Sequence, residues 1–197
     1  DAIAGFLAPE AGRVAVDGRD IGGDPPAARP VTLVFQENNL FPHLSVAQNV
    51  GLGLRPTLRL TASERRRVAE ALDETGLAGL GERAPDTLSG GQRSRAALAR
   101  ALLRDRPALL LDEPFAALGP GLRAEMIDLV QRTMRPRGAA VLMVTHAPED
   151  ARAAADLTAF CAAGRVDGAR PTAALLADPP PALRAYLGER QSSATAR

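Results

Sequence analysis

Three short apolar runs stand out along the chain, and each is followed at once by polar side chains. They cover residues 31–35, Ala108–Asp112 and residues 140–145. Such short, mainly aliphatic runs are typical of strands that are buried on both faces of a parallel sheet. Helical patterns follow at about Gly90–Leu103 and residues 121–134. Strands that alternate with helices predict an α/β fold built on a parallel sheet.

The stretch between the first two apolar runs has a helical pattern. Thr61 stands three residues before Glu64, which is the spacing of a capping box at a helix start. Glycines and a proline interrupt the pattern over residues 76–85. We therefore expect one domain over residues 1–197, with a helical subdomain of about residues 40–103 inserted into the α/β core.

Weaker signals mark the two ends of the sequence. Residues 1–7 have the pattern of the last turns of a helix, and no helix start signal precedes them. Residues 12–18 alternate and end in Asp-Gly, which predicts a short strand and a turn. Near the other end we expect a helix near Glu149, a strand near residues 157–162 and short helices bounded by prolines. We expect the start of the first helix to lie outside this sequence.

Composition narrows the possible classes of protein. Hydrophobic residues make up 46% of the chain and charged residues 24%, which fits a folded core. A net charge of +1 gives no electrostatic reason to expect nucleic acid as a partner. Cys161 is the only cysteine, so no internal disulfide is expected. No apolar run approaches the about 20 residues of a membrane span, and no signal-peptide pattern opens the sequence. We therefore expect a cytoplasmic protein.

The segment Leu88-Ser89-Gly90-Gly91-Gln92 carries the first chemical signal. Ser89 is a good N-cap residue, and two glycines just inside a helix leave its first N–H groups accessible. The N-terminus of a helix attracts anions through these groups and through its partial positive charge. The segment therefore predicts a phosphate-binding helix start, although an ordinary glycine-rich turn into a helix has the same composition.

Asp112 and Glu113 carry the second signal, because they follow directly on the apolar run that begins at Ala108. A strand that ends in two acids places carboxylates at the carboxyl edge of a parallel sheet, where ligands bind in α/β proteins. Asp112 can bind Mg²⁺, usually through water. Glu113 can polarise a water molecule for attack on a terminal phosphoryl group. A solvated acidic turn is the alternative for this pair taken alone.

Taken together, the two signals resemble those of the ABC transporter ATPase family. Gln92 and Asp112 are separated by 112 − 92 = 20 residues, which one helix fills, as between the LSGGQ signature and the Walker B strand of that family. Gln36 follows the first apolar run, where the Q-loop glutamine of the family falls. His146 follows the third run, where its switch histidine falls. The resemblance covers nearly the whole chain and implies the fold of a P-loop NTPase core, with most of its N-terminal β part outside this sequence.

The resemblance also implies roles for these residues. Gln36 would reach Mg²⁺ or the attacking water, and Asp112 would bind Mg²⁺. Glu113 would be the general base, and His146 would contact the γ-phosphate of ATP. The signature residues would bind the γ-phosphate of an ATP molecule that is held by a second ABC ATPase domain. We expect this second domain to be another copy of the chain. The signature residues are Ser89, Gly90, Gly91 and Gln92.

Two departures from the family pattern bear on activity. The P-loop, G-x-x-x-x-G-K-[ST], is absent, and all 24 basic residues of the chain are arginine. Residues 1–7 resemble the family segment just after that loop, so we expect residues 1–197 alone to lack ATPase activity. Gly119 stands where the family usually has the aspartate of the D-loop, a loop that helps to couple the two ATP sites. A catalytically inactive subunit is therefore an alternative function.

The segment Phe41-Pro42-His43-Leu44-Ser45-Val46-Ala47-Gln48-Asn49-Val50 resembles the importer branch of the family, in which it faces the transmembrane permease. Within that branch, residues 35–41, 110–126 and 142–146 are most similar to the ATPases of thiamine importers. Iron(III) and polyamine importers are the alternatives. The resemblance implies a peripheral ATPase on the cytoplasmic face of the inner membrane, linked indirectly to a solute-binding protein. A soluble ABC ATPase of DNA repair or translation is the alternative from another class, but the chain shows no sustained heptads.

Overall fold

The computed structural model describes residues 1–35 and 39–188. The chain forms two compact units, Asp1–His146 and Ala147–Arg197, and each is described by itself. No helix among the described residues is long and apolar enough to cross a membrane.

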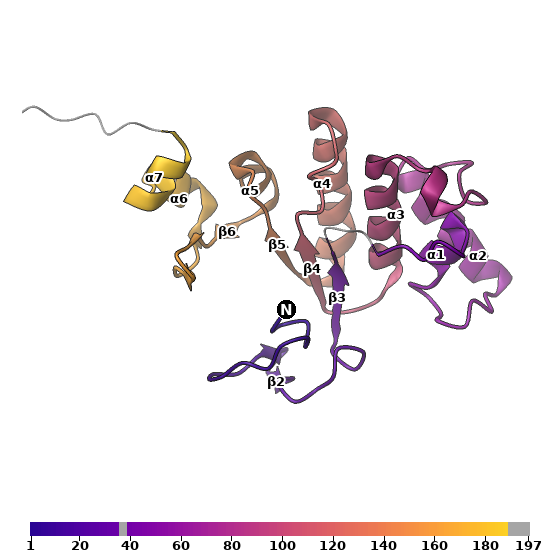
Figure 1. The fold of residues 1–197 in the computed structure, drawn as a ribbon, viewed down its shortest axis with the longest axis horizontal. Coiled ribbons are helices and arrows are strands. Elements are labelled where there is room, and N and C mark those ends of the chain that lie inside the picture. The colour runs from indigo at the N-terminus through magenta and orange to yellow at the C-terminus, as the bar shows by residue number, and fades with distance from the viewer. Residues whose placement is uncertain (36–38, 189–197) are drawn as a thin grey trace, which may run out of the picture. The chain divides into compact units, whose positions relative to one another are not determined.

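A three-stranded parallel sheet forms the centre of the first unit. Its strands are β3 (Val31–Val34), β4 (Ala108–Asp112) and β5 (Ala140–Val144), in the order β3-β4-β5 (Figure 1). Val34 pairs with Leu111, and Asp112 pairs with Val144, so the carboxyl ends of the strands lie at one edge. The predicted parallel sheet is therefore confirmed, within a residue of the predicted strand ends.

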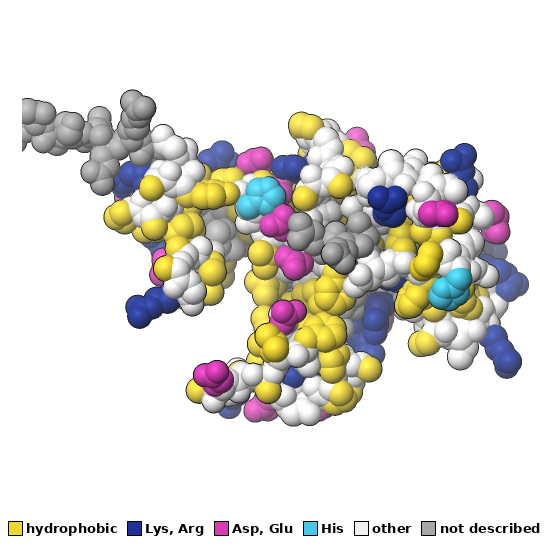
Figure 2. All heavy atoms as spheres, in the orientation of Figure 1, with side chains coloured by type: hydrophobic (Ala, Val, Ile, Leu, Met, Phe, Trp, Pro, Cys, Tyr) yellow, Lys and Arg dark blue, Asp and Glu magenta, His cyan; other side chains and the backbone are white. Residues whose placement is uncertain are grey.

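The middle strand of this sheet is the most deeply buried. Leu109 and Leu111 of β4 are almost fully excluded from solvent. Helix α4 (Pro120–Met134) follows β4, and its buried face carries Met126, Ile127, Leu129 and Val130. By contrast, β5 leaves Val141, Leu142 and Val144 exposed, and Figure 2 shows hydrophobic side chains at the surface where this strand runs.

The region between β3 and β4 is helical, as its sequence pattern predicts. It contains α1 (Val46–Gly51), α2 (Ala62–Glu74), a 3₁₀ turn (Pro85–Thr87) and α3 (Gly90–Leu103). The three α-helices share one apolar cluster, whose fully buried members include Val46, Val50, Leu77, Ala96 and Ala99. This cluster gives the helical region a core of its own.

Helix α2 begins with the predicted capping box. The Thr61 hydroxyl accepts a hydrogen bond from the Glu64 N–H, and the Glu64 carboxylate accepts one from the Thr61 N–H. This backbone hydrogen bond, together with the Arg55 guanidinium 2.6 Å from the carboxylate, lowers the pKa of Glu64 to about 2. The first turn of α2 therefore carries a carboxylate at neutral pH, which suits the positive end of the helix dipole.

The N-terminal residues form a hydrogen-bonded turn followed by a hairpin, and the helix end predicted over residues 1–7 is thus a turn and not an α-helix. The Phe6 N–H donates to the Asp1 carbonyl, and the Gly5 N–H donates to the Ala2 carbonyl. With Gly5 at a φ of 91°, these two bonds make the Schellman motif that commonly ends a helix. Beyond it, β1 (Ala15–Val16) pairs antiparallel with β2 (Arg19–Asp20) through the Asp-Gly turn predicted from the sequence.

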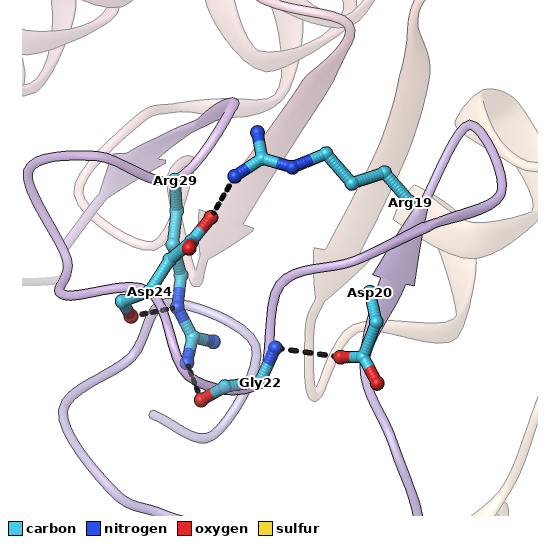
Figure 3. A network of polar contacts seen from close by, with 5 residues as sticks. All are labelled: Arg19, Asp20, Gly22, Asp24 and Arg29. Carbon is cyan, nitrogen blue, oxygen red and sulfur yellow. Dashed lines mark hydrogen bonds and ion pairs between the residues drawn. The ribbon is translucent and has the colours of Figure 1, made fainter.

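Arg29 joins this N-terminal turn to the loop that follows the hairpin. Its side chain is 2% exposed, and it donates to the main-chain carbonyls of Ala2, Ile3, Gly22 and Asp24 at 2.6, 2.8, 3.0 and 2.9 Å. Figure 3 shows two of these bonds, with the Asp24 carboxylate turned away toward Arg19. The guanidinium lies so close to Gly5 that a Cβ there would be 2.5 Å from its Nε atom. Glycine at position 5 therefore serves both the left-handed turn and the buried arginine.

The second unit is built from short elements. Helix α5 (Pro148–Ala154) leads into β6 (Leu157–Thr158), which pairs antiparallel with β9 (Arg170–Pro171). Between them, β7 (Cys161–Ala162) and β8 (Arg165–Val166) form a hairpin. The single strand predicted near residues 157–162 is thus two short strands. Helices α6 (Thr172–Ala177) and α7 (Pro181–Tyr186) complete the unit, each preceded by proline as predicted.

Replacement of Arg29 by methionine is expected to destabilise the first unit strongly. Methionine fills a similar volume but removes the four hydrogen bonds that Arg29 donates to partly buried carbonyls, and an unsatisfied buried group costs about 1–3 kcal/mol. We expect a loss of about 3–5 kcal/mol in the free energy of unfolding, measured by urea denaturation. The R19M variant is the control, because its exposed ion pair with Asp24 should be worth about 1 kcal/mol or less. A loss below 1 kcal/mol for R29M would contradict this account.

Candidate functional site

The carboxyl edge of the sheet brings together the residues that follow β4 and β5. Asp112 is the last residue of β4, is exposed and pairs with Val144 of β5. Glu113 and His146 follow these strands. Gln36, predicted to act at the same edge, lies outside the described residues.

Glu113 and His146 are in direct contact. The Nδ1 atom of His146 lies 3.0 Å from Oε2 of Glu113, within hydrogen-bonding distance. The Glu113 side chain is 27% exposed and that of His146 is 66% exposed. A half-buried carboxylate next to an accessible imidazole is suited to accept a proton from a bound water molecule. The structure thus brings together two residues that are 33 positions apart in the sequence, 146 − 113 = 33.

The backbone at Glu113 sets the direction of its side chain. Its φ is 44°, in the left-handed region that residues other than glycine seldom occupy. The Glu113 N–H donates to the Val144 carbonyl at 2.9 Å, one step beyond the end of the β4–β5 ladder. Backbone strain of this kind is typical of functional sites, where the surrounding structure maintains it.

The signature helix α3 begins at the predicted N-cap. The Ser89 hydroxyl accepts from the Gln92 N–H at 3.2 Å, and the Gln92 Oε1 atom accepts from the Ser89 N–H at 2.9 Å. The Gln92 side chain thus completes a capping box. Ser89 is exposed, and Gly90 and Gly91 are partly so. The first turn of α3 therefore presents N–H groups that have no acceptor within the helix, which favours an anionic ligand.

Gly91 also brings α3 close to the loop that follows Glu113. A Cβ at this position would lie 3.2 Å from a methyl group of Leu118 and 3.3 Å from the Ala117 carbonyl. Phe115 and Leu118 of that loop are buried, which fixes it against the core. Gly91 therefore also allows α3 to pack closely against this loop, since a larger residue would push the two apart. The motif alone does not reveal this role.

Comparison with known proteins decides the family. The family model described as ABC transporter matches residues 1–116, more than half of the chain. The chain belongs to the ABC transporter family. This membership agrees with the observed fold, and it confirms the prediction of an ABC transporter ATPase at the level of the family. It also makes the chain a nucleotide-binding protein.

Relatives in this family are similar over nearly the whole chain. The thiamine import ATP-binding protein ThiQ of Cereibacter sphaeroides is 64% identical over 95% of this chain and 81% of its own length. The proteins of the same name from Ruegeria and Brucella suis are 54% and 51% identical, over 95% and 96% of this chain and 81% and 79% of their own lengths.

A solved structure supports the fold. The ATP-binding cassette MJ0796, described as dimeric, in a post-hydrolysis state and bound to ADP and Pi, matches with a TM-score of 0.78 and 28% identity. The match covers 86% of this chain and 77% of the other. The ABC transporter chain described here therefore has the α/β core of an ATP-binding cassette, as its sequence predicts.

No group of three or more acidic, histidine or cysteine side chains among the described residues could bind a metal ion. A magnesium ion bound together with a nucleotide needs fewer protein ligands, because phosphate oxygens and water supply most of its coordination. The exposed carboxylate of Asp112 at the sheet edge fits this limited role.

Gly119, which departs from the family pattern, is the N-cap of α4. It has an extended backbone, with φ at −70° and ψ at 162°, and no side-chain cap. A Cβ at this position would meet nothing within 4 Å, so the structure accepts a side chain here. The first turn of α4 also carries no acidic residue.

The variant G119D is therefore expected to be more stable than the wild type. Aspartate can accept a hydrogen bond from the first turn of α4 and place a negative charge at the positive end of the helix, for about 1 kcal/mol in total. Urea denaturation measures the gain in the free energy of unfolding. G168D provides the control, since Gly168 also has open space around it but caps no helix. An equal gain in both variants would contradict the capping argument.

Proposed function

We propose that this chain is the ATP-binding and ATP-hydrolysing subunit of a thiamine importer. Relatives named as thiamine import ATP-binding proteins, with identities of 51–64%, support this substrate. The observation that supports catalysis is the 3.0 Å contact between Glu113 and His146 at the carboxyl edge of the sheet. An ATPase of this kind does not need to contact the transported solute itself.

In the proposed reaction, Glu113 is the general base. Its Oε1 and Oε2 atoms accept, and one of them takes a proton from the water that attacks the terminal phosphorus atom of ATP. In its protonated form, His146 donates to Oε2 through Nδ1–H, which orients the carboxylate, and can donate to a phosphate oxygen through Nε2–H. Removal of either side chain would leave the other without its orienting partner.

The magnesium ion would be bound by Asp112 and Gln36, as the family resemblance implies. When bound, it would neutralise negative charge on the phosphate oxygens of ATP. Asp112 is exposed at the end of β4 and can reach such an ion directly or through water.

The signature helix would complete an ATP site on a second ABC ATPase subunit. Ser89, Gly90 and Gly91 present a hydroxyl group and helix N-terminal amides, which suit the terminal phosphate of a nucleotide. Gln92 would contribute its side-chain NH2 group, since its main-chain N–H and its Oε1 atom form the capping box. The dimeric state of the similar MJ0796 structure supports a site shared between two chains.

The segment from Phe41 to Val50 would contact the transmembrane permease. Phe41 is 47% exposed, and its ring lies edge-on to that of His43, which is also exposed, with 5.9 Å between the ring centroids. Exposed aromatic side chains on an ordered surface are frequent anchors of protein interfaces. Through this contact the subunit would bind peripherally at the cytoplasmic face of the inner membrane, with a solute-binding protein as an indirect partner.

A chimera tests the proposed function. Residues 1–197 replace the matching segment of the Cereibacter sphaeroides protein, whose own N-terminal residues are retained, in a strain that lacks that protein. We expect the chimera to restore uptake of labelled thiamine. The E113Q chimera should lose about 10²–10⁴-fold in ATP turnover, because the amide cannot accept the proton, while its ATP binding persists. Restored uptake of another solute but not of thiamine would contradict the proposed substrate.

A binding experiment tests the shared site. The chain and the purified Cereibacter sphaeroides protein are expected to associate in the presence of ATP and Mg²⁺, as measured by sedimentation velocity. S89A should weaken this association by about tenfold, since it removes a phosphate ligand together with the helix cap. T61A is the matched control, because it removes the same kind of capping box from α2. Equal losses in both variants would show that S89A acts only through helix stability.

A further inference from the structure

The helix α1 contains a fully buried asparagine whose hydrogen bonds all reach back to the loop before the helix. Asn49 is 0% exposed. Its Oδ1 atom accepts from the Phe41 N–H at 2.7 Å, and its Nδ2 atom donates to the carbonyls of Phe41, Leu44 and Ser45 at 3.0, 3.1 and 3.0 Å. Asparagine is a poor helix former and is seldom buried, so its presence here requires a specific reason.

The four bonds fix the main chain of residues 41–45, which we call the docking loop. They leave the Phe41 and His43 side chains at the surface, in contact with each other. The loop bonds to itself as well, since the Leu44 N–H donates to the Phe41 carbonyl at 3.2 Å. Asn49 thus acts from beneath the loop and does not itself reach the surface.

The docking loop is also fixed to the signature helix. Arg100 of α3 donates to the carbonyl of Asn39, just before the loop, at 2.8 Å. At the other end of α1, Gly53 lies so close to α3 that a Cβ would be 2.2 Å from the Arg100 carbonyl. Val46 and Val50 pack in the same apolar cluster as Ala96 and Ala99 of α3. Helices α1 and α3 are therefore packed together, and the segment just before the docking loop is hydrogen-bonded to α3.

We propose that Asn49 is a positioning residue for partner docking, which presents Phe41 and His43 to the transmembrane permease in a fixed geometry. This inference rests on the proposed function, in which the loop contacts the permease. The four hydrogen bonds to one buried side chain make the loop shape depend on a single residue. Loss of that residue should loosen the docking loop without moving the signature helix.

The main test compares N49L with the wild type. Leucine has nearly the same volume and retains the packing of α1, but it removes all four hydrogen bonds to the loop. We expect amide hydrogen exchange in residues 41–45 to become at least tenfold faster, while exchange in α3 is unchanged. T75V is the matched control, because Thr75 is another almost fully buried polar residue of the helical region, and its hydroxyl group donates to the carbonyls of Ala71 and Leu72 within its own helix. Unchanged exchange in the loop of N49L would overturn the proposal.

A pH-dependent signature separates positioning from a general loss of stability. In N49D, the ionised carboxylate has no hydrogen atom to donate to the three carbonyls that Nδ2 of Asn49 bonds. The protonated form has one O–H group that can donate to one of them. Burial raises the pKa of such a carboxyl group, so the loop should become ordered as the pH falls through that pKa. The ¹⁹F NMR signal of a fluorinated Phe41 reports this change. The chain has five phenylalanines, so the F41A variant is used to assign the signal. A Phe41 signal that does not change with pH in N49D would contradict the proposal.

Binding to the membrane subunits of the Cereibacter sphaeroides thiamine importer, placed in lipid nanodiscs, gives the functional readout. N49L should weaken binding by about tenfold, and F41A should weaken it without faster exchange in the loop. T75V should bind like the wild type. Wild-type affinity of N49L despite a loosened loop would overturn the positioning role. If the wild-type chain itself does not bind, the proposed permease contact is wrong, and the exchange and ¹⁹F results then decide alone whether Asn49 fixes the loop.

Discussion

The hydrogen bond from the Glu113 N–H to the Val144 carbonyl fixes the geometry on which the site depends. It extends the pairing of β4 with β5 by one residue beyond Asp112. Because Glu113 has a positive φ, the chain turns sharply at this point while its amide remains in the ladder. His146 follows two residues after Val144, the last residue of β5, so the same bond brings the Glu113 carboxylate to the imidazole. Without it, neither the strained backbone nor the short contact would be maintained.

The loop that begins at Glu113 connects this pair to the signature helix. Phe115 and Leu118 are buried, and Gly91 of α3 lies against Ala117 and Leu118. One short segment therefore contacts β5 through its first residue and the first turn of α3 through its last residues. A change at the Glu113–His146 pair and a change at the signature helix cannot be structurally independent, because both displace the same packed loop.

The sequence predicts well those features that arise from local signals. The three strands of the sheet are recognisable from aliphatic runs, although β5 is mostly exposed and not buried as its run predicts. The starts of α2 and α3 are recognisable from the Thr61–Glu64 spacing and from the N-cap residue Ser89. The family resemblance implies a role for Glu113 and for His146 but not their direct contact, because that contact depends on the register of two strands. Arg29 and Asn49 carry no motif, and their roles depend on carbonyl groups that come together only after folding. The proximity of Gly91 to Ala117 is equally tertiary in origin.

The buried polar residues show where this chain uses specific hydrogen bonds instead of apolar packing. Arg29 and Asn49 each bond to main-chain groups of irregular segments, which have no ladder or helix to satisfy them. An apolar side chain at either position would fill the space but remove these side-chain hydrogen bonds. Arg29 fixes the turn that brings Phe6 to Phe35, at 5.7 Å between ring centroids, directly before Gln36. Asn49 fixes the loop that begins soon after the same glutamine. The segments that end at Phe35 and begin at Phe41 are therefore each fixed by one buried polar side chain that has no part in the catalytic pair.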